Sequence, residues 1–115
     1  MTEILPQEVW LAKFPFDEDE QQSKNRPVIV LDVDGENCTV LSMKVTSRKP
    51  YSEFEIEIFN WAEIPLDHLS TADASSVKLI PKSNFYKKFG RLSDDDWDNV
   101  TDLYFRYLKS VGAID

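Results

Sequence analysis

Apolar and polar positions alternate most regularly between residues 53 and 58. The apolar side chains of this segment are Phe54, Ile56 and Ile58, and the polar ones between them are Glu53, Glu55 and Glu57. Because successive side chains of a strand point to opposite faces, this period of two predicts a half-buried strand. We expect the three glutamates to form its solvated face and not a cluster of catalytic carboxylates.

Four other segments also carry strand signals. They are short runs rich in β-branched and aromatic side chains, at residues 9–16, 28–33, 37–45 and 76–81. Asp34-Gly35 predicts a tight hairpin turn between the second and third of these runs. The run at 28–33 does not alternate, which indicates a strand buried on both faces. The polar residues 17–25 predict a loop, and residues 61–69 a turn or a single helical turn.

Residues 93–111 have the pattern of an amphipathic helix. Ser93 is typical of an N-cap, and the three aspartates that follow it complement the positive end of the helix dipole. Gly112 is typical of the residue just past a helix. One face carries apolar side chains at helical spacing, and we expect all of them to pack in the core: Trp97, Val100, Tyr104, Tyr107, Leu108 and Val111.

Together these elements predict a single domain that is mainly β. A chain of 115 residues, 42% of them hydrophobic, is long enough for a core but too short for two domains. About five short strands with tight links, followed by one helix, favour a small and strongly bent β-barrel with the C-terminal helix packed on it. The domain would span residues 1–115, with residues 1–6 as an N-terminal tail.

The charge is unevenly distributed. A net charge of −8 argues against a surface that is basic overall, as many nucleic-acid-binding proteins have. The acids concentrate at the two ends: residues 1–23 carry six acidic side chains against one lysine, and residues 92–115 carry six against two basic ones. The middle, residues 24–91, holds ten basic and nine acidic side chains. A local basic surface is therefore compatible with the composition.

Other features restrict the setting. No apolar run approaches the roughly 20 residues of a membrane span, and the first residues lack the features of a signal peptide, so we expect a cytoplasmic protein without membrane contact. Cys38 is the only cysteine, which fits a reducing compartment, and we expect it to be a small buried apolar residue. One cysteine and one histidine (His68) cannot form a zinc site. We expect neither a metal nor another cofactor.

Asn25-Arg26-Pro27 is the most informative tripeptide of the chain. It joins the acidic loop to the buried strand, so we expect Arg26 where that strand begins, with Pro27 fixing the backbone at its first residue. A guanidinium held in this way can bind a phosphate or a carboxylate through two hydrogen bonds. The alternative is a surface arginine that pairs with the acids just before it.

Six segments, taken in order, resemble the PemK/MazF family of toxins from type II toxin–antitoxin systems. They are VWLAKFPF, NRPVIVLDVD, LSMKVTS, YSEFEIEI, SSVKLI and FGRLSDDDWDNV, which together span roughly residues 7–108. The resemblance implies an SH3-like small barrel of the PemK/MazF/CcdB toxin superfamily that forms a homodimer. It also implies an endoribonuclease that cleaves single-stranded mRNA and is inhibited by a disordered segment of a cognate antitoxin.

The resemblance also implies site residues. Arg26 matches the family's catalytic arginine and Thr46 its catalytic hydroxyl residue, and the adjacent Ser47 can share that role. Such an enzyme needs no metal, because the 2′-hydroxyl of RNA is the nucleophile and the arginine stabilises the developing charge on the phosphate. The residues that would contact the RNA around this point are Gln21, Gln22, Lys24, Asn25, Lys44, Arg48 and Lys78.

The chain departs from the family pattern at several positions. Gln21-Gln22 stands where the family often has Glu-Gln, and Ile80 stands where some members have an aspartate that acts on RNA. Pro6-Gln7-Glu8 replaces the usual Gly-Asp before the first strand. These departures and the net negative charge leave a second interpretation open, in which a catalytically degenerate protein of the toxin fold binds a protein target or an antitoxin.

Overall fold

The computed structural model describes residues 3–16, 18–19, 21–60 and 69–115. Its elements, in chain order, are β1 (Glu8–Pro15), β2 (Ser23–Asp34), β3 (Thr39–Thr46), β4 (Glu55–Glu57), β5 (Thr71–Pro81), the short 3₁₀ helix η2 (Lys82–Asn84), β6 (Phe85–Arg91) and α1 (Asp94–Ser110). The strands form one sheet in the order β4-β5-β3-β2-β1-β6, and every neighbouring pair is antiparallel. The predicted mainly β class with a C-terminal helix is confirmed.

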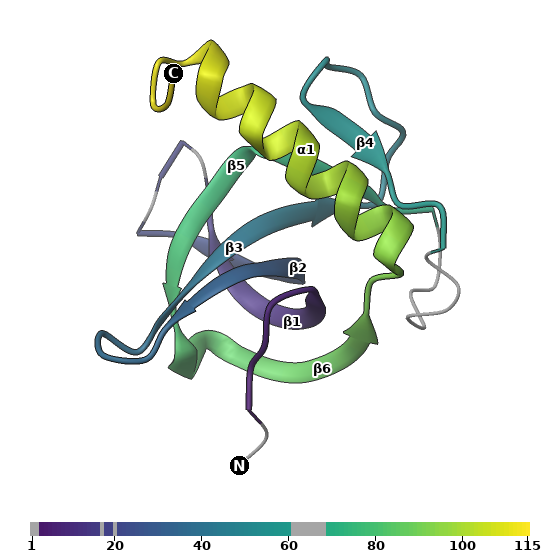
Figure 1. Ribbon diagram of the computed structural model, residues 1–115. Coiled ribbons are helices and arrows are strands. Elements are labelled where there is room, and N and C mark those ends of the chain that lie inside the picture. The colour runs from purple at the N-terminus through teal and green to yellow at the C-terminus, as the bar shows by residue number, and fades with distance from the viewer. Residues whose placement is uncertain (1–2, 17, 20, 61–68) are drawn as a thin grey trace.

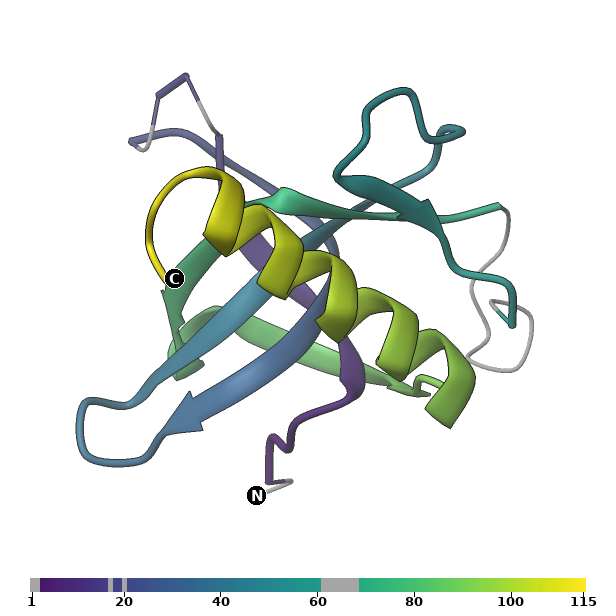
Figure 2. The same ribbon diagram turned by 45° about the horizontal axis from the view of Figure 1, so that its top comes forward.

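The sheet is strongly bent, and α1 crosses it diagonally (Figure 1). The helix packs against β5 and β4. In the second view, the chain that follows β1 and the chain that follows β3 both lie along the upper side of the molecule, far from the turn between β2 and β3 (Figure 2). Antiparallel pairing explains this arrangement, because the ends of β1 and β3 lie on either side of the start of β2.

Two clusters of buried apolar side chains stabilise the domain. The first includes residues of both the sheet and α1: Val9, Ile29, Met43, Val45, Ile58, Ala72, Ala74, Leu92, Val100 and Leu103. The second belongs to the opposite face of the strands: Trp10, Ala12, Phe14, Val28, Val30, Val40 and Ile80. Because neighbours in a strand alternate between these clusters, the expected burial of β2 on both faces is confirmed for Val28–Val30.

The start of α1 agrees with the expectation. Ser93 is the N-cap, and its hydroxyl accepts a hydrogen bond from the Asp96 backbone N–H. Asp96 is more than a charge at the helix end, because it is 2% exposed and its carboxylate accepts bonds from the backbone N–H groups of Phe59 and Asn60 at 3.0 and 2.9 Å. One buried side chain therefore joins α1 to the chain that leaves β4.

The end of α1 differs from the predicted apolar face. Val111 was expected in the core, but it is the C-cap and is 56% exposed. Leu103, which was not in the predicted set, is 3% exposed and belongs to the first cluster. The helix ends one residue before Val111, so the helical spacing no longer directs that side chain inward. Gly112 has φ +76°, as expected for the residue that follows a helix.

Gln7 ties the start of β1 to neighbouring segments. Its backbone has φ +77°, a conformation that glycine adopts most easily. Its N–H donates to the Val30 carbonyl, and its side chain donates to the Leu92 carbonyl and to Asp94 and accepts from Arg91. These bonds offset the strain of a residue with a Cβ at this position.

Several predictions from the sequence were wrong. β2 begins at Ser23, so Arg26 lies inside the strand, opposite Ala12, and not at its first residue. The polar residues 23–25 hid this strand because β2 pairs with β1 alone there, and pairing with β3 begins only at Val28. Pro27 therefore lies where one side of the strand has no partner strand, a position that tolerates a missing N–H.

Three further expectations change. Glu55 is not solvated, because its side chain is 3% exposed and forms an ion pair with Arg48. Cys38 is exposed at the turn between β2 and β3, with φ +54°. The strand β6 was missed, since its mixed lysines and aromatics at 85–91 do not alternate cleanly. The expected turn at 61–69 and His68 lie, apart from residue 69, outside the described residues.

Candidate functional site

Strand pairing brings Arg26 and Thr46 to the same place. Val28 of β2 pairs with Lys44 of β3 in antiparallel register. Two residues further along each strand, in opposite directions, are Arg26 and Thr46. Side chains two apart share a face of a strand, so both residues lie on the face that carries the second apolar cluster, just beyond its last buried side chains.

A cavity of about 390 Å³ lies at this point, and we refer to it as the Thr46 cavity. Its lining combines the start of β2, the end of β3 with the two residues after it, and one residue before β5: Lys24, Asn25, Arg26, Pro27, Val45, Thr46, Ser47, Arg48 and Ser70. The Oγ1 atom of Thr46 is buried and has no hydrogen-bond partner among the residues that the structure describes. A hydroxyl that forms no hydrogen bond within the protein can donate one to a bound ligand.

A second cavity, of about 330 Å³, lies on the other side of Arg26, and we call it the Lys44 cavity. It is lined by Phe14, Pro15, Phe16, Glu18, Lys24, Arg26 and Lys44. Lys24 and Arg26 belong to both linings, so they form the wall between the two cavities. This lining holds three basic side chains and one carboxylate, that of Glu18, so its formal charge is positive, which favours an anion.

Two of the three predicted lysines, Lys44 and Lys78, are held by contacts within the protein. Lys44 lies 3.7 Å from the carboxylate of Asp73, a β5 residue that is 5% exposed. Lys78 donates to the Phe16 carbonyl at 3.4 Å, and its ammonium lies 6.0 Å from the ring centroid of Phe14. Lys78 therefore lies beside the lining of the Lys44 cavity, next to the strand that carries Lys44.

Arg48 is held by Glu55. Its guanidinium donates two parallel hydrogen bonds to that carboxylate, at 2.6 and 2.7 Å, which is the fork geometry of strong arginine–carboxylate pairs. These bonds lower the pKa of Glu55 and raise that of Arg48. The Arg48 carbonyl also accepts a bond from the Thr71 hydroxyl. Arg48 lines the Thr46 cavity, but much of its charge is balanced by this pair.

The remaining predicted residues lie at the rim. Asn25 lines the Thr46 cavity, and Ser47 lines it from an exposed position. Gln21 and Gln22 are exposed in the turn before β2 and belong to the lining of neither cavity. The structure thus brings Arg26, Thr46 and Ser47 together, with the lysines around them.

Reasoning from the sequence missed two residues here. Glu18 lines the Lys44 cavity and is the carboxylate among its lining residues, although from the sequence we considered the loop acids only as ion-pair partners of Arg26. Ser70 lines the Thr46 cavity just before β5. A carboxylate among polar residues of a loop has no distinctive spacing, so no pattern could have selected it.

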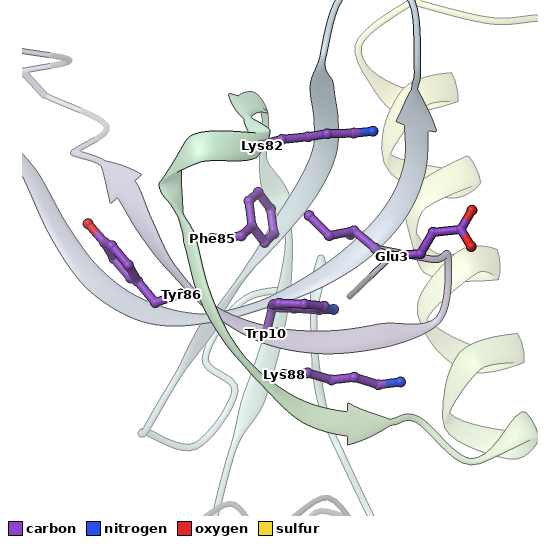
Figure 3. A pocket seen from close by; sticks show the side chains of 7 residues that line it. Glu3, Trp10, Lys82, Phe85, Tyr86 and Lys88 are labelled. Carbon is purple, nitrogen blue, oxygen red and sulfur yellow. The ribbon is translucent and has the colours of Figure 1, made fainter. Parts of the chain in front are cut away.

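A third cavity, of about 450 Å³, lies between the N-terminal segment, β1 and β6, and we call it the Trp10 cavity (Figure 3). It is lined by Glu3, Ile4, Trp10, Lys82, Phe85, Tyr86 and Lys88, none of which the sequence singled out as a site residue. Beside it, buried Glu8 accepts from the Trp10 indole N–H at 3.0 Å and lies 2.6 Å from the Lys88 ammonium. Burial would raise the pKa of Glu8, but the hydrogen bonds from Lys88, Trp10 and the Leu5 backbone outweigh it and lower that pKa.

Comparison with protein families gives one match. Residues 6–103 match the family described as the PemK-like, MazF-like toxin of type II toxin–antitoxin systems. Comparison with curated proteins gives no match. Within the described residues, no helix has the length and apolar character needed to span a membrane.

Solved structures of low sequence identity share the fold. An endoribonuclease from a mycobacterial species, solved with its cognate antitoxin, superposes with a TM-score of 0.73 at 10% identity over 98% of this chain and 99% of that one. The Mycobacterium tuberculosis toxin MazF-mt6 gives 0.70 at 16% identity, over 89% and 96%. MazF from Deinococcus radiodurans gives 0.70 at 19% identity, over 95% and 98%.

Proposed function

This chain belongs to the PemK-like, MazF-like family of type II toxin–antitoxin toxins, and we propose that it is an endoribonuclease that cleaves single-stranded mRNA. The observation that carries the proposal is the position of Arg26 and Thr46 on one cavity, with Lys24 beside them and Lys44 beyond Arg26. A phosphodiester is the anion that fits such a group, because it offers oxygens to a guanidinium and to a hydroxyl at the same time.

The reaction requires few protein groups. The 2′-hydroxyl of the RNA attacks the adjacent phosphorus, the bond to the 5′ oxygen breaks, and a 2′,3′-cyclic phosphate and a 5′-hydroxyl result. In our proposal Arg26 donates hydrogen bonds to the phosphate oxygens, which gain charge in the transition state. The Thr46 hydroxyl, with Ser47 beside it, donates to the same group and thereby gains the partner that it lacks within the described protein.

The reaction also needs a proton acceptor. Glu18 supplies a carboxylate on the Lys44 cavity, on the other side of Arg26 from Thr46. We propose that it takes the proton of the 2′-hydroxyl, while solvent returns a proton to the departing 5′ oxygen. Glu18→Gln should therefore slow cleavage while the affinity for RNA stays unchanged, whereas a change in affinity alone would contradict this role.

Lys24, Lys44 and Lys78 would bind the phosphates on either side of the reacting one, and Arg48, Asn25, Gln21 and Gln22 would contact the neighbouring nucleotides. Relatives of this fold have been solved with their antitoxins. We propose that a cognate antitoxin segment likewise covers these cavities and excludes RNA, and that the toxin acts as a cytoplasmic homodimer.

Purified protein should cleave a labelled single-stranded RNA of mixed sequence in the presence of EDTA. Arg26→Ala should reduce the rate by a hundredfold or more, on the order expected for one preorganised donor. Arg106→Ala is the matched control, because that arginine lies on the exposed face of α1 and is paired with Asp102. Intact RNA at high protein concentration, or equal cleavage by the Arg26 variant, would refute the proposal.

A second candidate is a degenerate toxin that binds a protein. It is favoured by the net charge of −8 and by the carboxylate of Glu18 on the cavity, since both repel RNA. Expression without an antitoxin separates the two. Growth arrest that disappears with Arg26→Ala supports the nuclease, and arrest that persists in this variant supports a protein target.

A further inference from the structure

The chain between β3 and β4 presents one aromatic ring to solvent. Tyr51 is 77% exposed, more than any other large apolar side chain in the described part of the chain. An exposed tyrosine is by itself ordinary on a protein surface. This one is distinguished by how firmly its position is determined.

Glu55 organises the chain around Tyr51. One oxygen of its buried carboxylate accepts both an Arg48 N–H at 2.6 Å and the Tyr51 backbone N–H at 3.0 Å. The other oxygen accepts the second Arg48 N–H at 2.7 Å. The guanidinium carbon of Arg48 in turn lies 3.8 Å from the centroid of the Tyr51 ring. One face of the ring is thus covered by Arg48, and its high exposure leaves the other face to solvent.

The ring also lies close to the proposed site. Arg48, which covers it, is part of the lining of the Thr46 cavity. A polymer whose phosphate lies in that cavity therefore has its adjoining residue within reach of Tyr51. Unpaired bases of single-stranded RNA are recognised largely by stacking on such rings, and a ring held in place loses little entropy when a base binds.

We propose that the open face of Tyr51 is a stacking site for an unpaired nucleobase next to the phosphate bound at Arg26. This inference rests on the proposed function. It adds a base-binding residue, and with it a source of sequence preference, to a site otherwise built from phosphate contacts. In this proposal the Arg48–Glu55 pair holds the Tyr51 ring in place. That role explains why an arginine that lines the cavity is neutralised by a carboxylate.

The test measures binding without cleavage. A fluorescent RNA oligonucleotide with 2′-O-methyl groups at every position lacks the nucleophile, so its affinity can be measured by anisotropy. Tyr51→Ala should weaken binding by about tenfold, the size expected for one stacked base. Tyr51→Trp should bind as tightly as the wild type or more tightly, because indole also stacks.

Tyr86→Ala is the matched control. Tyr86 is 56% exposed and lines the Trp10 cavity, so it is a similar ring at a different place (Figure 3). Its variant should bind the oligonucleotide like the wild type. An oligonucleotide of abasic 2′-O-methyl units should bind the wild type and Tyr51→Ala equally, because it has no base to stack.

Equal affinity of wild type and Tyr51→Ala for the base-containing oligonucleotide would overturn the inference, and so would an equal loss in Tyr86→Ala. Failure of the wild type to bind any oligonucleotide would overturn both proposals. Binding that depends on Tyr51, together with no cleavage of ordinary RNA, would uphold the stacking site and reject the nuclease.

Discussion

The start of α1 and the start of β2 use polar side chains in opposite ways. At the helix, buried Gln7 and Asp96 have their polar groups engaged with other segments of the chain. Beside the start of β2, by contrast, the buried hydroxyl of Thr46 at the end of β3 has no hydrogen-bond partner within the described residues, and three cations and one carboxylate line the neighbouring cavity.

In our proposal, this difference separates polar groups that stabilise the fold from those that bind RNA. A buried carboxylate that joins two segments lowers the free energy of the folded state. The Thr46 hydroxyl forms no hydrogen bond within the described residues, and in our proposal an oxygen of the RNA phosphate becomes its partner. Variants of the first region should therefore lose stability and keep activity per folded molecule, and variants of the second should do the reverse.

Asp96→Ala should produce the largest loss of stability. It leaves the backbone N–H groups of Phe59 and Asn60 without their buried acceptor, at a cost of about 3 kcal/mol. Urea denaturation measures the loss. The control is Asp95→Ala in the same helical turn, where an exposed carboxylate should contribute only a few tenths of a kcal/mol. Equal losses of stability in the two variants would show that the buried hydrogen bonds of Asp96 do not stabilise the fold.

Thr46→Val should produce the opposite result. Cleavage should fall on the order of a hundredfold, about 2.7 kcal/mol of transition-state stabilisation, while the urea midpoint stays unchanged or rises, because the hydroxyl has no partner to lose within the described protein. Thr46→Ser should restore most activity. Thr39→Val, at the other end of the same strand, is the control. A large stability loss in Thr46→Val would show that its hydroxyl is structural.

Glu55→Gln tests the ion pair between Glu55 and Arg48. The substitution should lower the free energy of unfolding by about 1 kcal/mol at neutral pH, since Arg48 is partly exposed and its charge is screened. The hydrogen bonds from Arg48 hold the pKa of Glu55 below its ordinary value of 4.5. The stabilisation is therefore present above pH 4.5 and disappears as the pH falls through the folded-state pKa.

Urea titrations of wild type and Glu55→Gln at several pH values measure how the stabilisation by Glu55 depends on pH. The stability difference should be constant from pH 7 to about pH 5 and should shrink below that. A difference that grows on acidification has the wrong sign for a depressed carboxylate pKa and would contradict the ion pair.

Modification of Cys38 should have the smallest effect. The thiol is exposed at the turn between β2 and β3, and this turn lies far from the ends of β1 and β3 (Figure 2), so native protein should react readily with a maleimide. Stability should change by less than about 0.5 kcal/mol, as for other surface changes, and cleavage should not change. Slow labelling of the native protein would contradict the exposure of the thiol, and a loss of cleavage would show that this turn contributes to the site.

The chain pattern predicted the elements that depend on local chemistry. Ser93 and Gly112 mark the limits of α1, and the alternation around Ile56 marks β4. Helix capping and the alternation of buried side chains in a strand both depend on residues close in the chain, so the sequence shows them directly. Strands that depend on a partner were harder to predict. β6 was missed, and the start of β2 was placed too late, because a polar strand is held by backbone pairing that composition does not reveal.

The same distinction applies to the site. Residue type and order were enough to predict the mainly β fold with its terminal helix, the family, and Arg26, Thr46 and Ser47 as candidates. The folded arrangement was needed to show that Arg26 lies within a strand, that Glu18 joins it on a cavity, that Glu55 is buried against Arg48, and that Tyr51 is held with one face open. These features arise where residues that are distant in the chain come into contact. Antiparallel register and burial determine those contacts, and neither can be read from neighbouring residues alone.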